Sequence, residues 1–223
     1  MKKGMLHGLE VWGDNACFSR PEVTERTTYP IPTHSACRGI FDAIYWKRSA
    51  NFYWQIVGVE VVNPIRYMGI MRNEMKDKVT RRTLQVDLTT QKHRTQKHTR
   101  TLLDPRYRIF ARAVCRNPDG NTNAIDAQFR RRAERGQCFH QPFLGCKEFM
   151  ANFQLVPVDE HDPSQGLADL QVDVGVMVYD TFNLLVPDGD PSVSVFHAQI
   201  KDGAVAYPEF TDSAAVFRPG GAA

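Results

Sequence analysis

The sequence predicts an α+β protein in which strands and helices interleave over the first two thirds of the chain. Segments in which apolar and polar residues alternate, as in strands, flank two segments in which apolar residues recur every three or four positions, as in helices. From about residue 159 onward, short β-rich runs are separated by turns rich in Pro, Gly and Asp, which is typical of an antiparallel sheet. A chain of 223 residues, 42% of them hydrophobic, can bury the core of such a fold.

The amino-terminal elements begin with a strand, which the alternation predicts over residues 7–11. An extended loop punctuated by prolines is expected over residues 19–32. A helix follows it, capped by Thr33 or Ser35 and ending close to Tyr45, because its apolar side chains recur at helical spacing.

Two strands and a basic excursion come next. Residues 52–62 are dense in aromatic and β-branched side chains and predict a strand that Asn63-Pro64 stops, and residues 65–71 predict a second strand. Residues 72–104 contain many cations and few large apolar side chains. We therefore expect an exposed, mobile loop there, and long loops of this kind are often functional.

The middle of the chain completes the pattern. Residues 107–114 predict a strand, and the helix after it is capped by Asn121 or Asn123 and ends at Gly136. A last strand is expected over residues 149–158. The order strand, helix, strand, strand, helix, strand is the ferredoxin-like arrangement that RNA-recognition domains share.

These elements predict two domains. A ferredoxin-like domain over residues 1–158, with a basic insertion at about 72–104, precedes a small antiparallel β-sheet domain over residues 159–223. The strands of the second domain are expected over residues 172–178, 181–186, 193–200 and 204–207.

The charge distribution indicates a polyanionic partner. The net charge is only +3, but residues 1–136 carry 25 Lys and Arg against 13 Asp and Glu, whereas residues 137–223 carry 3 against 12. Aromatic side chains lie among the cations, as in the segments 45–48 and 106–108. Cations beside flat rings suit the phosphates and unpaired bases of RNA, although a plain solvated surface is the competing interpretation.

Several enzyme classes lack their motifs in this sequence. There is no G-x-S-x-G of serine hydrolases and no glycine-rich phosphate loop. Five cysteines without a C-x-x-C pair indicate reduced thiols in the cytoplasm, and no apolar run is long enough for a membrane span. Cys138, His140 and Cys146 are a candidate zinc set, but a fourth ligand is missing, so we expect no metal and no cofactor.

The remaining chemistry is metal-free RNA cleavage, in which the 2′-hydroxyl beside the scissile phosphate is the nucleophile. Such a site needs groups that transfer protons and a cation that balances the charge of the phosphorane. Histidine can transfer protons near neutral pH, and His93 and His98 are the two histidines adjacent to a lysine.

Five segments occur in an order that carries a family resemblance. They are residues 17–22 (CFSRPE), 28–33 (TYPIPT), 39–46 (GIFDAIYW), 63–67 (NPIRY) and 143–149 (FLGCKEF). Together they resemble the Dvulg-subtype (type I-C) members of the CRISPR-associated Cas-five family, over about residues 5–215.

The resemblance implies a ferredoxin-like domain of the RAMP superfamily followed by an antiparallel sheet. It also implies an endoribonuclease that cuts CRISPR repeat RNA without metal and then stays on the 5′ handle of the crRNA. In that role the protein is a subunit of the type I-C Cascade complex, beside the backbone and large subunits, and meets target DNA only through the complex. A non-catalytic subunit that caps the handle is the alternative, and a metal-dependent DNA nuclease is a third hypothesis.

The resemblance also implies site residues. A catalytic Tyr, Lys and His fall by position on Tyr45, Lys97 and His98, with Lys92-His93 as a rival pair. In this hypothesis Tyr45 or His98 accepts the 2′-hydroxyl proton, His98 protonates the leaving oxygen, and Lys97 stabilises the phosphorane. The expected RNA-binding residues are Arg20, Lys47, Arg48, Arg94, Arg100, Arg130, Arg131 and Arg135.

Overall fold

The structure is a computed structural model that describes residues 1–21, 25–75, 94–158, 167–186 and 189–217. Its main sheet has five strands in the order β11-β4-β7-β1-β8, and each neighbouring pair is antiparallel. The strands are β1 (Lys2–Trp12), β4 (Phe52–Val61), β7 (Arg106–Cys115), β8 (Asn152–Val156) and β11 (Ala204–Ala206).

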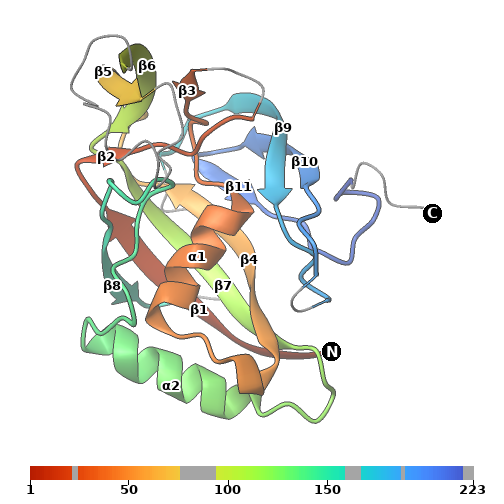
Figure 1. The fold of residues 1–223 in the computed structure, drawn as a ribbon. Helices are drawn as coiled ribbons and strands as arrows, with labels where there is room; N and C mark the ends of the chain where they lie inside the picture. Colours follow the sequence, from red (N-terminus) through yellow and green to blue (C-terminus); the bar gives the residue numbers. More distant parts are fainter. Residues whose placement is uncertain (22–24, 76–93, 159–166, 187–188, 218–223) are drawn as a thin grey trace, which may run out of the picture.

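Two helices complete the ferredoxin-like arrangement. Helix α1 (His34–Ile44) connects β1 to β4, and helix α2 (Thr122–Glu134) connects β7 to β8. The chain order β1-α1-β4-β7-α2-β8, with β7 and β1 in the centre of the sheet, confirms the predicted topology. Both helices lie on the same face of the sheet (Figure 1).

The core between helices and sheet is built of aromatic rings. Phe41 of α1 stacks on Phe129 of α2 at 5.1 Å between ring centroids, and Trp54 of β4 lies 4.6 Å from Phe129. His7 of β1 reaches Asp126 of α2 at 2.9 Å in the same buried layer. These contacts fix the two helices against each other and against the central strands.

The helix boundaries agree with the sequence-based caps. Thr33 accepts the backbone N–H of Ala36 at 3.1 Å, and Tyr45 follows the last helical residue of α1. Asn121 accepts the N–H of Ala124 at 3.1 Å at the start of α2, and Gly136 lies beyond its end with a φ of 63°.

The expected loop over residues 72–104 is wrong where the structure describes it. Strand β5 (Tyr67–Met75) pairs antiparallel with β6 (Arg94–Leu103), and the short strands β2 (Asn15–Ala16) and β3 (Arg26–Thr27) also pair with β6. A hairpin therefore extends from the domain where exposed coil was expected (Figure 1). Its first strand, β5, begins two residues later than the predicted strand 65–71 and ends four residues later. The sequence did not indicate this hairpin, because backbone hydrogen bonds between β5 and β6, rather than a buried apolar face, hold the two strands together. Residues 76–93, including Lys92 and His93, lie outside the described residues.

The carboxy-terminal part contains a second hairpin, in which β9 (Val172–Asp180) pairs with β10 (Ser194–Ile200). The strand expected over residues 181–186 is wrong, because Asp180 accepts the backbone N–H groups of Thr181 and Phe182 at 2.8 and 3.1 Å and turns the chain. Strand β11 leaves this region and joins β4, so the segment after residue 158 completes the main sheet.

The boundary between two domains near residue 158 stays a prediction. Within the described ranges, no helix has the length and apolarity that a membrane crossing requires.

Candidate nucleic-acid interface

The predicted site residues fall into two regions. Lys97, His98, Arg94 and Arg100 lie on β6 of the hairpin, at the top of Figure 1. Tyr45 lies at the other end of the molecule, where α1 ends beside α2. The structure therefore does not bring Tyr45 together with Lys97 and His98.

Lys97 and His98 also point away from each other. Consecutive side chains of a strand leave opposite faces, and the register sets Met71 opposite His98 but Arg72 opposite Lys97. His98 is exposed, whereas Lys97 is half-buried with its Nζ 3.6 Å from a carboxylate oxygen of Glu74. The two side chains of this dipeptide cannot converge on one phosphate while the hairpin keeps this register.

The face that carries His98, which we call the hairpin face, combines cations with exposed apolar groups. The Arg100 guanidinium lies 3.9 Å from the centre of the Tyr67 ring, and Met71 beside them is 60% exposed. Arg94, the first residue of β6, projects from the same side. A ring, a planar cation and an exposed thioether offer stacking surfaces for bases together with charge for phosphates.

The opposite face of the hairpin is an ion network. Glu74 contacts Arg26 of β3 at 3.6 Å, and Glu148 pairs with both Arg26 and Arg72. The Arg72 side chain, together with the charges of both arginines, keeps the pKa of Glu148 below its usual value. These contacts fasten the hairpin to the loop after α2, and Glu74 also pairs with Lys97.

At the other region, Tyr45 is held by its neighbours. Its ring stacks on Phe52 at 6.0 Å between centroids, and the Arg132 guanidinium lies 5.3 Å from its ring centre. Arg132 also donates to the carbonyl oxygen of Ile44 at 2.9 Å and so closes the end of α1. Arg132, which belongs to the arginine-rich face of α2, thus serves to position Tyr45.

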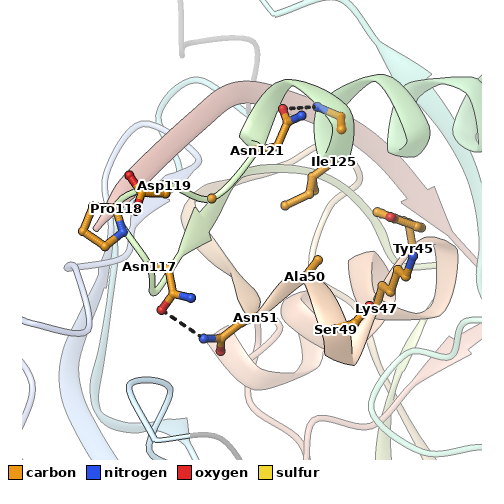
Figure 2. Close-up of a pocket in the computed structure, with 12 residues that line it drawn as sticks. Tyr45, Lys47, Ser49, Ala50, Asn51, Asn117, Pro118, Asp119, Asn121 and Ile125 are labelled. Carbon is orange, nitrogen blue, oxygen red and sulfur yellow. Dashed lines mark hydrogen bonds between the residues drawn. The ribbon is translucent and has the colours of Figure 1, made fainter.

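Tyr45 lines a pocket of about 520 Å³ at this end of the sheet, which we call the terminal pocket (Figure 2). Its wall combines apolar and polar side chains with the first turn of α2. The residues are Tyr45, Lys47, Ser49, Ala50, Asn51, Asn117, Pro118, Asp119, Gly120, Asn121, Ala124 and Ile125. Figure 2 shows that the loop after β7 forms one side and the segment 45–51 the other. This size is in the range of small-ligand sites.

The amides of the pocket are held in place. Asn51 has a left-handed backbone with a φ of 47°, accepts from Arg116 at 3.2 Å, and approaches the Asn117 oxygen with its amide nitrogen at 3.4 Å. Asparagine adopts this conformation more readily than other non-glycine residues, and here it ends the helical turn over residues 48–50. The sequence analysis did not identify Asn51 or Asn117 as site residues. For Asn117 a signal was present, because residues 117–120 form a turn directly before the helix cap Asn121.

The other predicted RNA-binding residues lie beside the terminal pocket or further along α2. Lys47 lines it, and Arg48 begins the short 3-10 helix η1 (Arg48–Ala50) beside it. Arg130, Arg131 and Arg135 are exposed on α2, where Arg130 lies 3.7 Å from Glu134 and Arg131 donates to Gln128 at 2.9 Å.

Arg20 lies apart from that group. Its guanidinium is 4.8 Å from the Tyr29 ring, and its backbone pairs with Thr27 of β3 near the hairpin. Tyr67, whose ring lies on the hairpin face, was not among the predicted RNA-binding residues. Its position directly after Arg66 in the sequence was the signal that could have indicated it.

The candidate zinc residues are not assembled. All three belong to the loop after α2, where Cys146 lies against Cys17 with its Sγ 3.6 Å from the Cys17 carbonyl oxygen. Within the part of the chain that the structure describes, no three His, Cys, Asp or Glu side chains are grouped as metal ligands.

Comparison with solved structures defines the class. The fold matches a structure described as "Crystal Structure of CRISPR-associated Protein" with a TM-score of 0.69 at 21% identity, covering 97% of this chain and 98% of that one. It also matches the uncharacterised protein SMU1763c from Streptococcus mutans with a TM-score of 0.68 at 19% identity, with the same coverage. The architecture is thus that of a ferredoxin-like α+β protein.

Sequence comparison then gives the family. The Cas5d family model, described as "CRISPR-associated protein (Cas_Cas5)", matches residues 8–215. A protein of Mannheimia succiniciproducens is 36% identical over 218 residues, which cover 91% of this chain and 94% of that protein. A protein of Thermus thermophilus is 32% identical over 223 residues, covering 90% of each. Both are named "CRISPR pre-crRNA endoribonuclease Cas5d". The chain belongs to the Cas5d family.

Proposed function

We propose that this protein is a metal-independent endoribonuclease that cleaves CRISPR repeat RNA in the terminal pocket and binds the RNA with the hairpin face. The names of two relatives above 30% identity support endoribonuclease activity on pre-crRNA. One observation carries the choice of site: the terminal pocket holds Tyr45, Lys47 and the first turn of α2 together, whereas Lys97 and His98 diverge.

The reaction is a transesterification within the RNA. The 2′-oxygen loses its proton and bonds to phosphorus, the bond from phosphorus to the 5′-oxygen breaks, and that oxygen takes up a proton. The products are a 2′,3′-cyclic phosphate and a 5′-hydroxyl. The Tyr45 hydroxyl is the proton-transfer group in this proposal, and the Lys47 ammonium and the positive end of the α2 dipole balance the charge on the phosphorane.

The hairpin face and the cations around the pocket then share one RNA. His98, Arg94 and Arg100 bind bases and phosphates at one end, and Lys47, Arg48, Arg130, Arg131 and Arg135 bind phosphates at the other. After cleavage the protein stays on the 5′ handle as a subunit of the type I-C Cascade complex, beside its backbone and large subunits. The catalytic set of Tyr45, Lys97 and His98 is the rival proposal, which requires the hairpin to change register or position.

A second candidate function follows from the make-up of the pocket. Among the described residues that line it, none is a histidine, which is the side chain that most often transfers protons near neutral pH. A non-catalytic subunit that caps the handle needs only the binding surfaces, so this observation favours that alternative.

The decisive experiment uses the purified full-length chain and a transcript of the repeat from its own CRISPR array. We expect cleavage in the presence of EDTA, a 2′,3′-cyclic phosphate at the new end, and no cleavage when the sugar at the cut site is 2′-deoxy. Binding without cleavage would establish the capping subunit instead. Loss of cleavage with EDTA, or cleavage of the deoxy substrate, would overturn the proposed mechanism.

A further inference from the structure

Two thiols meet outside the RNA site. Cys17 is fully buried next to strand β2, and Cys146 is half-buried in the loop after α2, far away in the sequence. The Cys146 Sγ lies 3.6 Å from the Cys17 carbonyl oxygen, and each side chain shifts the pKa of the other. The Cys17 N–H also donates to the carbonyl oxygen of Leu144 at 3.1 Å, so the two segments run in contact.

Gly145 makes this approach possible. It has a φ of 85°, and a Cβ at this position would lie 2.0 Å from the Cys17 carbonyl oxygen. Any other residue would push the two cysteine segments apart. The backbone is therefore shaped to hold the sulfurs close together.

The surroundings of the pair stabilise a negative charge. The hydrogen bond from Cys146 lowers the pKa of Cys17 to about 6 despite burial, and Ser19, Arg26 and Arg72 act in the same direction. The hydrogen bond to Cys17 raises the pKa of Cys146. At neutral pH the pair thus shares one proton and carries one negative charge.

We propose that Cys17 and Cys146 are a redox-active dithiol, a modification site at which a low-molecular-weight disulfide such as oxidised glutathione converts the two thiols into an intramolecular disulfide. Half-buried Cys146 is the sulfur that meets the reagent. Its proton passes to Cys17, and its thiolate attacks one glutathione sulfur and releases a glutathione thiolate. Cys17 then loses the proton and attacks the Cys146 sulfur of the mixed disulfide, which releases the second glutathione thiolate. The protein loses two electrons and the single proton that the pair held, and one oxidised glutathione becomes two glutathione thiolates, which take up protons from solvent.

The position of the pair connects it to the hairpin. Arg26 and Arg72, whose charges act on Cys17, are also the arginines that pair with Glu148 two residues beyond Cys146. Arg72 belongs to β5 and Arg26 to β3, both of which border β6. Oxidation removes the negative charge of the thiol pair that Arg26 and Arg72 stabilise. The new disulfide bond also links the loop after α2 to the residue that follows β2.

The test measures the cysteines directly and does not depend on RNA cleavage. The native full-length protein is equilibrated in glutathione buffers of increasing oxidised fraction, quenched with acid, unfolded and alkylated. We expect two of the five cysteines to lose their label together, at an oxidised-to-reduced ratio about tenfold lower than in the urea-unfolded chain. Peptide mapping should recover one crosslinked pair that contains residues 17 and 146.

Two variants control this result. Cys146→Ser should abolish the paired loss, and Cys138→Ser, which changes the other half-buried cysteine, should leave it intact. If Cys146→Ser does not fold, the peptide map of the wild-type protein decides alone. A crosslink to Cys138, a mixed glutathione adduct that never closes, or oxidation no easier than in the unfolded chain would each overturn the proposal.

Discussion

Lys97 and His98 are consecutive in the sequence, yet their side chains leave opposite faces of the β5–β6 hairpin. His98 lies on the exposed face with Met71, and Lys97 lies on the other face beside Glu74. In a coil, the backbone can direct both side chains of a Lys-His pair toward one phosphate. In a strand, the alternation of side chains divides the pair between two surfaces.

The first prediction concerns Tyr45. Tyr45→Phe keeps the ring that packs on Phe52 and under Arg132 but removes the hydroxyl, so folding and RNA affinity should change little. Loss of a proton-transfer group typically costs about a hundred- to ten-thousand-fold in rate, and we expect single-turnover cleavage to fall by such a factor. Tyr67→Phe is the matched control, because the same atom is removed from a ring on the hairpin face, and its cleavage rate should stay unchanged. Wild-type rates in Tyr45→Phe would refute the role of the terminal pocket.

The second prediction separates the two proposed catalytic centres. His98→Ala should weaken RNA binding a few-fold and leave the cleavage rate at saturating protein nearly unchanged, because His98 belongs to β6, far in the fold from the end of α1 that carries Tyr45. The measurement is a single-turnover rate over a range of protein concentrations. If the saturating rate instead falls by the hundred-fold or more typical of a lost general acid, catalysis occurs on the hairpin as the rival proposal states.

The third prediction tests the hairpin face as an RNA-binding surface. Arg100→Ala removes the cation that lies over Tyr67, and we expect weaker binding of repeat RNA with a salt dependence reduced by about one unit of slope. The measurement is the dissociation constant at several salt concentrations. Arg66→Ala is the control, since this exposed arginine pairs with Asp104 at 3.0 Å and should matter less. Equal slopes in Arg100→Ala and the wild type would exclude a phosphate contact by Arg100.

The fourth prediction concerns the ion pair that joins β9 to α1. Arg38 donates to both Asp180 oxygens, at 2.9 and 3.1 Å, and His34 Nδ1 lies 3.4 Å from the same carboxylate. Burial raises the pKa of Asp180, but the contact with His34 and the charge of Arg38 outweigh this and lower it to about 2. A folded-state pKa below the ordinary value of 3.8 means that the carboxylate stabilises the fold above about pH 4, and that this stability is lost between about pH 4 and pH 2.

Asp180→Asn should therefore reduce the free energy of unfolding at pH 7 by roughly 3 kcal/mol, the typical cost of breaking a buried ion pair. The difference from the wild type should shrink as the pH falls from 4 towards 2, which urea unfolding at several pH values can measure. Asp173→Asn, an exposed carboxylate on the same strand, should change the stability by less than about 1 kcal/mol. A constant difference across that pH range would contradict the assigned pKa.

The ferredoxin-like core was predictable because its signals are local. Apolar spacing and the caps at Thr33 and Asn121 placed both helices, and the alternation of residues placed the strands of the core. These patterns depend on hydrogen bonds and side-chain directions within a few residues of each other, so one sequence window contains them. Family membership, too, followed from ordered segments of the sequence.

The arrangement of the site depended on contacts between distant segments. Pairing of β5 with β6 divided Lys97 from His98, and the packing of α1 beside α2 set Tyr45 into a pocket with residues that follow β7. Cys17 and Cys146 likewise met only because Gly145 allows two segments to touch. Local periodicity cannot specify such contacts, because strand register and helix packing depend on the free energy of the whole chain. Register and packing then determine whether a side chain lies on a surface, in a pocket or against a partner.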